Sequence, residues 1–207
     1  MPDGSPVRRR ILDAAFSAFI DAGYAATTTL EIARRARVSK RELYAVVGNK
    51  QEMLVACIRE RASRLRLPDG LPDPDDRDTL ERVLVAVGAQ LLRETTNDTV
   101  IAVFRVAIAE AVRAPEVAEA LELHGRRTGR AALTAIMTHA TDRGLLDGHP
   151  GELAEQFSGL LWGDLMIGLL LRVVTPPNPR EIERRAAGAA AALLRQRCSS
   201  QGSRAVS

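Results

Sequence analysis

The stretch from Thr27 to Lys50 most constrains what this chain can fold into, because three helix-start signals follow one another there. Each signal is an N-capping side chain followed three residues later by a glutamate, the spacing of a capping box. The three pairs are Thr28–Glu31, Ser39–Glu42 and Asn49–Glu52. They predict two short helices and the start of a third. About three residues connect the first two, the length expected of a helix-turn-helix.

The second of these helices, from Lys40 to about residue 46, has the composition of a DNA-recognition helix. Helical spacing turns Leu43 and one of residues 46–47 inward. Lys40, Arg41 and Tyr44 then face outward. A short helix with cations on its outer face suits the major groove of DNA. The alternative is an ordinary surface helix.

The run from Arg9 to about Arg61 resembles the N-terminal DNA-binding domain of TetR-type transcriptional repressors. The resemblance rests on Gly23-Tyr24, the Thr-rich cap, Ile32-Ala33, Val38-Ser39, Leu43-Tyr44 and Lys50. The sequence departs from the family at two places. Arg37 stands where the family usually has glycine, so a left-handed backbone there would be strained by a Cβ atom. Two valines, at 46 and 47, replace a more usual aromatic-containing pair, which predicts a smaller core behind the recognition helix.

Six residues are predicted to contact DNA. We expect Lys40 and Arg41 to reach phosphates or guanine edges, and Tyr44 to hold a phosphate. Hydroxyl groups, helix N-terminal N–H groups and an ammonium group would add phosphate contacts from Thr28, Ser39 and Lys50.

The charge distribution agrees with a nucleic-acid partner. The net charge is only +3, but residues 1–66 carry 13 Lys and Arg against 7 Asp and Glu. The rest of the chain is net acidic. A basic N-terminal third on an acidic body favours a polyanion such as double-stranded DNA as partner of that third. A solvated charged surface is the alternative, but the only two lysines, Lys40 and Lys50, both lie in the helix-turn-helix stretch.

Composition and periodicity predict an all-α fold of about nine helices. Aromatic residues make up only 3% of the chain, so Ala, Leu and Val build the core, as in helical bundles. Apolar residues recur at helical spacing, and no strand-length alternating segment competes. We expect a three-helix DNA-binding domain at 1–49, a connecting helix at 50–66, an effector-binding and dimerisation bundle at 67–197, and a disordered tail at 198–207.

The C-terminal region resembles the AefR-like ligand-binding and dimerisation domain of TetR-type regulators. The similarity rests on FRVAIAEAVRAPEVAEAL, on LAEQFSGLLWGDLMIGLLL and on a closing amphipathic helix. The resemblance implies that the last two long helices of each subunit form a four-helix dimer interface. It also implies that the preceding helices surround a pocket for a small molecule.

The predicted interface of a homodimer combines small residues, which let helices approach closely, with large apolar ones. Its residues are Phe157, Leu160, Leu161, Ala186, Ala190, Leu193 and Leu194. The alternative is that these side chains pack inside one subunit.

The predicted pocket would hold a small, mainly apolar effector. The candidates are Phe104, Arg105, Ile108, Leu121, His124, Met137, Trp162, Asp164 and Met166. Arg105 and Asp164 are charges within apolar segments, so each needs a partner. A structural ion pair or an interface salt bridge is the alternative account of both, and a core or rim histidine is the alternative for His124.

Other classes of protein are disfavoured. Cys57 and Cys198 form no zinc spacing and no disulfide framework, which predicts a reducing cytoplasm. The N-terminus lacks a signal peptide's apolar region, and the longest apolar run, 157–174, contains two charges. No catalytic motif, metal spacing or phosphate loop is present, so we expect neither an enzyme nor a cofactor.

The sequence therefore predicts a TetR-type one-component transcriptional regulator. We expect a repressor that binds a palindromic operator as a dimer and is released by a small-molecule effector. A ligand-independent architectural DNA-binding protein is the alternative, and a helical-bundle enzyme is disfavoured by the missing catalytic groups.

Overall fold

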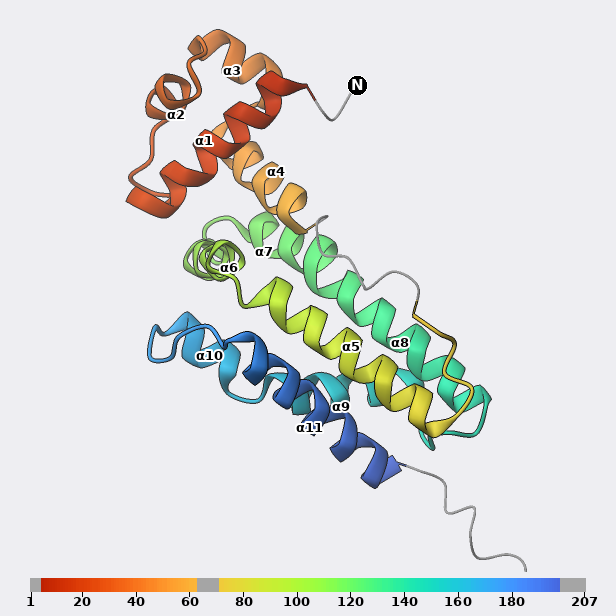
Figure 1. The fold of residues 1–207 in the computed structure, drawn as a ribbon. Coiled ribbons are helices and arrows are strands. Elements are labelled where there is room, and N and C mark those ends of the chain that lie inside the picture. The colour runs from red at the N-terminus through yellow and green to blue at the C-terminus, as the bar shows by residue number, and fades with distance from the viewer. Residues whose placement is uncertain (1–4, 63–70, 198–207) are drawn as a thin grey trace, which may run out of the picture. The chain divides into compact units, whose positions relative to one another are not determined.

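The structure, a computed structural model, describes residues 5–62 and 71–197. Those residues form eleven α-helices and one short π-helix, with no β-strand among them (Figure 1). In chain order these are α1 (Pro6–Ala22), α2 (Thr29–Ala36), α3 (Lys40–Val47), α4 (Lys50–Ala62), α5 (Arg77–Thr95), α6 (Asp98–Glu110), α7 (Pro115–Leu121), the π-helix η1 (Glu122–Arg126), α8 (Arg127–Asp142), α9 (Pro150–Trp162), α10 (Leu165–Leu170) and α11 (Pro179–Arg197). The predicted all-α fold is confirmed. The predicted tail at 198–207 and the end of the predicted connecting helix at 63–66 lie outside the described residues.

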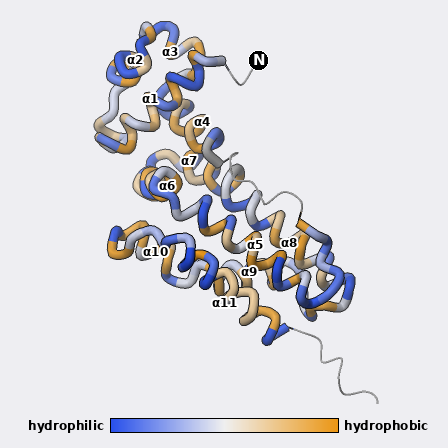
Figure 2. Tube along the Cα trace, in the orientation of Figure 1, coloured by the Kyte–Doolittle hydropathy of each residue, from blue (hydrophilic) through white to orange (hydrophobic). Residues whose placement is uncertain are grey.

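Hydrophobic and hydrophilic residues alternate along most helices, as Figure 2 shows. This is the pattern of helices that cover a core with one face and meet water with the other. The described helices include none that is long and apolar enough to cross a membrane.

The chain divides into two compact units, and the first combines two separate parts of the sequence. Unit 1 contains α1–α4 together with α6, α7 and η1. Its core includes Phe19 of α1, Leu43 of α3 and Met53 of α4, all at most 1% exposed. Val103 of α6 and Val117 of α7 belong to the same core. The predicted connecting helix α4 is therefore packed into this core through one face.

Unit 2 contains α5 and α8–α11. Helix α11 packs against both α5 and α9, and Figure 1 shows α5 and α11 running in opposite directions. Gly88 of α5 makes the close approach possible. A Cβ atom at Gly88 would lie 3.1 Å from Phe157, 3.2 Å from Leu161 and 3.4 Å from the Cβ of Ala186. One side-chain-free position thus lets three helices meet.

Two long helical segments are each interrupted, which brings the number of described helices above the nine or so that were predicted. The segment 150–173 divides at Gly163, whose φ of +43° suits a residue without Cβ and ends α9. The segment 115–142 contains η1, a π-turn that includes Gly125 and separates α7 from α8. Helical periodicity continues through both points, so the sequence pattern alone did not locate them.

The compact units do not follow the expected boundaries at residues 49 and 66. Residues 99–127 form one compact unit with the N-terminal helices, and the domain boundaries at 49 and 66 stay a prediction. Within this unit, Val103 of α6 and Val117 of α7 share a core with residues of α4, and α7 packs against α4.

Candidate nucleic-acid interface

The helix-turn-helix is formed by α2 and α3, and each begins with a side-chain cap. Thr28 Oγ1 accepts a hydrogen bond from the N–H of Glu31 at 3.2 Å. Ser39 Oγ accepts one from the N–H of Glu42 at 3.0 Å. Both capping residues are exposed, as contacts with a phosphate would require. Each hydroxyl satisfies a helix N–H group that has no partner within the helix.

The turn between the two helices has the strained residue that the sequence indicated. Arg37 has φ 53° and ψ 48°, the left-handed region, and its N–H donates to carbonyls of the last turn of α2. The N–H of Val38 donates to the carbonyl of Ala33 at 3.0 Å, which completes the helix end. Arg10 Nε of α1 donates to the carbonyl of Ala36 at 2.7 Å. The turn is thus held despite a Cβ atom where glycine is favoured.

The outer face of α3 carries the predicted recognition residues. Lys40 and Arg41 are exposed and Tyr44 is 44% exposed, whereas Leu43 is fully buried. The ammonium of Lys40 lies 5.8 Å from the centre of the Tyr44 ring. Val46 and Val47 are both half-buried against the core. The inward and outward residues of α3 are those expected from helical spacing.

A hydrogen bond joins the outer face of α3 to the first turn of α2. Thr29 Oγ1 and the Tyr44 hydroxyl are 3.2 Å apart, and either can donate. This contact places the exposed start of α2, with Thr28, beside Lys40 and Tyr44. Thr29 is not among the six residues predicted to contact DNA, although it lies within the Thr-rich cap that carries the family resemblance.

Lys50 has a different environment from the expected one. Its Nζ donates to the backbone carbonyls of Tyr24 at 2.8 Å, Thr27 at 3.0 Å and Ala25 at 3.4 Å. The ammonium also lies 4.4 Å from the centre of the Tyr24 ring. The ammonium therefore lies against the loop between α1 and α2, with its two shorter hydrogen bonds to the carbonyls of Tyr24 and Thr27.

Tyr24 also lies near two acids of α6 and α7. Burial, followed by the negative charges of Glu110 and Glu116, raises the pKa of the Tyr24 phenol. The phenol therefore keeps its proton at neutral pH. Its neighbourhood brings the α1–α2 loop close to helices that come from much later in the sequence, within unit 1.

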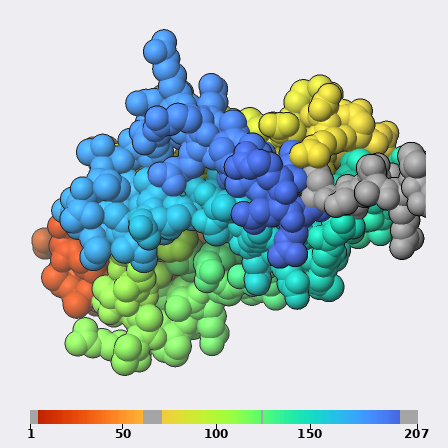
Figure 3. Space-filling model, turned by 90° about the horizontal axis from the view of Figure 1, so that it is seen from below, coloured from red at the N-terminus to blue at the C-terminus, as the bar shows by residue number. Residues whose placement is uncertain are grey.

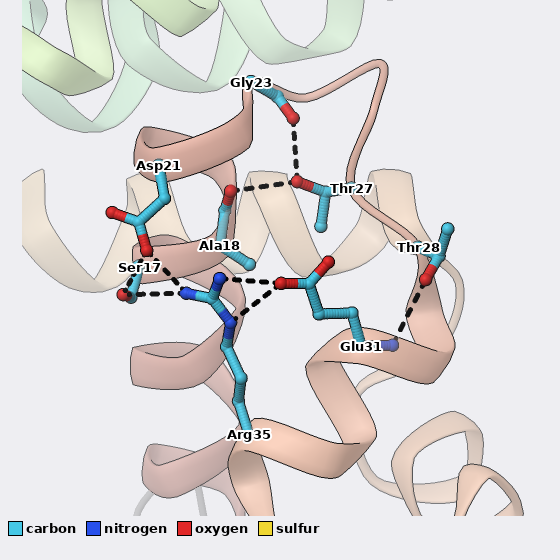
Figure 4. A network of polar contacts seen from close by, with 8 residues as sticks. All are labelled: Ser17, Ala18, Asp21, Gly23, Thr27, Thr28, Glu31 and Arg35. Carbon is cyan, nitrogen blue, oxygen red and sulfur yellow. Dashed lines mark hydrogen bonds and ion pairs between the residues drawn. The ribbon is translucent and has the colours of Figure 1, made fainter.

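A polar network around Arg35 fixes how α1 and α2 meet, as Figure 4 shows. Arg35 Nη1 lies 2.6 Å from Asp21 Oδ2, and Arg35 Nη2 lies 2.7 Å from Glu31 Oε1. The hydrogen bond from Arg35 lowers the pKa of the Asp21 carboxyl. Glu31, expected to complete a capping box with Thr28, pairs with Arg35 instead. Reciprocal capping occurs at the start of α4, where Asn49 and Glu52 each accept from the other's N–H.

Most of the residues predicted to form the dimer interface are buried within the single subunit. All of them except Leu160, which is half-buried, are at most 2% exposed within the single subunit. The buried set is Phe157, Leu161, Ala186, Ala190, Leu193 and Leu194. These side chains fill the core between α5, α9 and α11, and the dimer interface stays a prediction. Helical periodicity marked a buried face correctly but did not tell which chain buries it.

The predicted pocket residues are spread over both units. Phe104, Arg105, Ile108, Leu121 and His124 belong to unit 1, and Met137, Trp162, Asp164 and Met166 belong to unit 2. Ile108 is 59% exposed, Met137 is fully buried, and the side chain of His124 lies outside the described part. Asp164 is exposed at the break between α9 and α10, where its carboxylate can meet water. Arg105 is half-buried.

Two family models match the chain. Residues 11–57 match the model described as bacterial regulatory proteins of the tetR family. Residues 82–196 match the model described as the C-terminal domain of AefR-like transcriptional repressors. Together the two matches span the helix-turn-helix and most of the region from α5 to α11.

Individual relatives agree with the family models. The chain is 26% identical to the uncharacterized HTH-type transcriptional regulator YvkB of Bacillus subtilis, over 86% of this chain and 92% of the relative. It resembles the crystal structure of a TetR transcriptional regulator from Agrobacterium tumefaciens, with 28% identity, a TM-score of 0.82, and coverage of 94% and 96% of the two chains. It has the fold of the flavonoid-responsive regulator FrrA, with 24% identity, a TM-score of 0.77, and coverage of 93% and 97%. The matched proteins are transcriptional regulators rather than enzymes.

Proposed function

The chain belongs to the TetR family of transcriptional regulators and has an AefR-like C-terminal domain. We propose that it is a repressor that binds a palindromic operator as a homodimer and releases the operator when a small molecule binds. The observation that carries the proposal is the exposed face of α3. Lys40, Arg41 and Tyr44 point outward there, and the Thr29–Tyr44 contact sets the start of α2 beside them.

The chemistry of this face suits DNA in two ways. Arg41 and Lys40 supply cations that can reach phosphates or the O6 and N7 acceptors of guanine in the major groove. The exposed hydroxyls of Thr28 and Ser39 lie at helix N-termini, where N–H groups and the helix dipole favour an anion. Phosphate contacts give affinity, and base contacts give sequence preference.

The homodimer proposal rests on the exposed side of α9 and α11. A Cβ atom added at Gly159 or at Gly188 would meet nothing within 4 Å, so the backbone of both helices is open to a neighbour there. Leu160 is half-buried, and Ala187 is exposed beside Gly188. In Figure 3 the segment from about α10 to α11, in shades of blue, forms much of the visible surface. Small residues allow a second pair of helices to pack closely, and a two-fold pair of heads would read a palindrome.

The proposed coupling between effector and DNA uses the shared core of unit 1. Val103 of α6 and Val117 of α7 pack in one core with Met53 of α4 and Leu43 of α3. A ligand that binds better when α6 and α7 are displaced would therefore favour a displaced head as well, because packed cores move as units. The predicted pocket residues that belong to unit 1, Phe104, Arg105, Ile108 and Leu121, are the candidates for its contacts there.

Selection of the purified protein against a randomised duplex pool tests the proposal. We expect a palindromic winner with half-sites about one helical turn, ~34–36 Å, or a multiple of it apart. A mass of two chains by light scattering at micromolar concentration would support the dimer. Absence of any enriched sequence, with binding that is lost steeply as salt rises, would replace this proposal with an architectural DNA-binding protein.

The effector proposal needs a separate measurement. Compounds that raise the thermal unfolding midpoint identify ligands, since binding to the folded state stabilises it. Each ligand is then added to a titration of protein into the selected duplex. The coupling predicts weaker operator binding for at least one ligand, and a ligand that leaves operator affinity unchanged counts against release by that molecule.

A further inference from the structure

Lys50 is one of only two lysines in the chain, and it contacts three backbone carbonyls of the loop between α1 and α2. As the first residue of α4, it sends its ammonium to the carbonyls of Tyr24, Ala25 and Thr27, at 2.8, 3.4 and 3.0 Å. Charged hydrogen bonds to carbonyls are stronger than neutral ones. The side chain therefore ties the start of α4 to residues 24–27.

The same loop is anchored from the other side by α1. Thr27 is 1% exposed, and its Oγ1 lies 3.0 Å from the carbonyl of Ala18 and 2.7 Å from that of Gly23 (Figure 4). The hydroxyl has one proton to share between these two acceptors. Residue 27 is thus held both by its side chain, from α1, and by its carbonyl, from Lys50.

The held loop leads directly into the proposed DNA-contacting surface. Thr28, the next residue, is the N-cap of α2. Thr29 follows and bonds the hydroxyl of Tyr44 on α3. A shift of the Thr27 carbonyl would move the cap hydroxyl, the free N–H groups of the first turn of α2, and the partner of Tyr44.

We propose that Lys50 is a positioning residue for DNA binding, which sets the N-terminal end of α2 through the carbonyls of Tyr24, Ala25 and Thr27 without contacting DNA itself. The inference rests on the proposed function, because it assumes that α2 and α3 contact DNA. It differs from a direct phosphate contact, the other role open to a lysine at this place. A phosphate would have to take an N–H of the ammonium away from a carbonyl.

The two roles differ in how binding depends on salt. Each phosphate neutralised by a cation releases counterions, and its loss makes the slope of log K against log salt less negative by about 0.9. A misplaced helix start loses hydroxyl and N–H contacts, which release no counterions. Lys50→Met keeps the apolar length of the side chain and removes its charge. Lys40→Met, on the exposed face of α3, is the matched control.

The experiment titrates both variants and the wild type with the palindromic duplex recovered by selection, at four salt concentrations. We expect Lys50→Met to weaken binding by roughly tenfold or more, the effect of losing charged hydrogen bonds, with an unchanged salt slope. Lys40→Met should make the slope of log K against log salt less negative by about 0.9. Affinities are corrected for the active fraction by stoichiometric titration, so that partial unfolding does not pass for weak binding.

Two further variants separate positioning from charge and from general stability. Lys50→Arg keeps the charge but replaces a compact three-donor group by a planar one. Positioning predicts that Lys50→Arg also binds weakly, whereas a phosphate contact predicts near wild-type binding. In a Thr29→Val background, positioning predicts that Lys50→Met costs less than it does alone, because the contact it sets is already lost.

A slope that is less negative by about 0.9 in Lys50→Met, with normal binding by Lys50→Arg, overturns positioning in favour of a phosphate contact. Unchanged affinity of Lys50→Met overturns both. If Lys50→Met does not fold, Lys50→Arg decides alone. Failure of the wild type to bind any duplex would instead remove the proposed function on which the inference rests.

Discussion

Helices α3 and α11 are both amphipathic, but α3 is distinguished by the residues on its exposed face and α11 by the breadth of its buried face. On α3 the apolar face is narrow, with Leu43 buried, and the exposed face carries Lys40, Arg41 and Tyr44. On α11 the apolar face is broad and closes the core of its own subunit with Leu193 and neighbours. Periodicity identifies the buried face in both helices. Periodicity does not identify which chain covers the buried face. The function of an exposed face can be predicted only where its residues are charged or polar groups suited to a particular partner.

The largest expected effect concerns the α9–α11 side of this comparison. Phe157→Ala should destabilise the fold by about 3–5 kcal/mol, because a fully buried ring is replaced by a cavity between α5, α9 and α11. Urea unfolding measures the change. Glu155→Ala, at an exposed position of the same helix, is the control and should stay within about 0.5 kcal/mol. A Phe157→Ala variant with normal stability but a monomeric mass would return Phe157 to a dimer interface.

The next effect concerns the exposed face of α3. Arg41→Ala should lose about 1–3 kcal/mol of binding to the selected duplex and relax the preference at one base pair, with unfolding unchanged because the side chain is exposed. Binding titrations against single-base variants of the duplex measure both effects. Arg130→Ala, at an exposed position of α8, serves as control. Equal binding by Arg41→Ala and the control would deny α3 a role in sequence recognition.

A smaller effect is expected at the turn that sets the angle between α2 and α3. Arg37→Gly should stabilise the fold by about 1 kcal/mol, because φ 53° carries a penalty for any residue with a Cβ atom. Arg34→Gly should destabilise by about 1 kcal/mol, since Arg34 lies within α2 itself. Thermal unfolding without DNA compares the two. Destabilisation by Arg37→Gly would mean that contacts of the arginine outweigh its backbone strain.

The smallest effect concerns the exposed Asp21–Arg35 pair between α1 and α2. The pKa of the Asp21 carboxyl is lowered in the folded state, so its contribution to stability is present above the unfolded pKa of about 3.9 and is lost as pH falls through the folded value. Asp21→Asn should therefore be slightly less stable than the wild type at pH 7, and this difference should shrink below pH 4. The urea unfolding midpoints of the two proteins, compared at pH 7 and again below pH 4, measure this difference. A difference that grows on acidification would contradict the assignment.

The helix-turn-helix was predictable in most of its detail. The caps at Thr28 and Ser39, the buried Leu43 and the strained Arg37 are local features, each set by residues within a few positions. The family resemblance in both regions agrees with the matched models.

What could not be predicted depends on contacts between distant residues. Lys50 reaches carbonyls 23–26 positions earlier, and a backbone carbonyl leaves no mark in the sequence. Glu31 accepts hydrogen bonds from Arg35, which also pairs with Asp21 of α1, instead of accepting one from the backbone N–H of Thr28. The packing of α6 and α7 with α4 depends on tertiary burial that amphipathic patterns allow but do not specify.

Amide hydrogen exchange with and without the selected duplex tests the central claim most directly, because it reports on both regions in one measurement. We predict that DNA slows exchange at the start of α2 and along α3, over residues 28–44, and leaves the most protected amides of α9 and α11 unchanged. Those amides should already exchange slowly without DNA, since their side chains close the core of unit 2. Slowed exchange elsewhere in the chain, with residues 28–44 unaffected, would contradict the account.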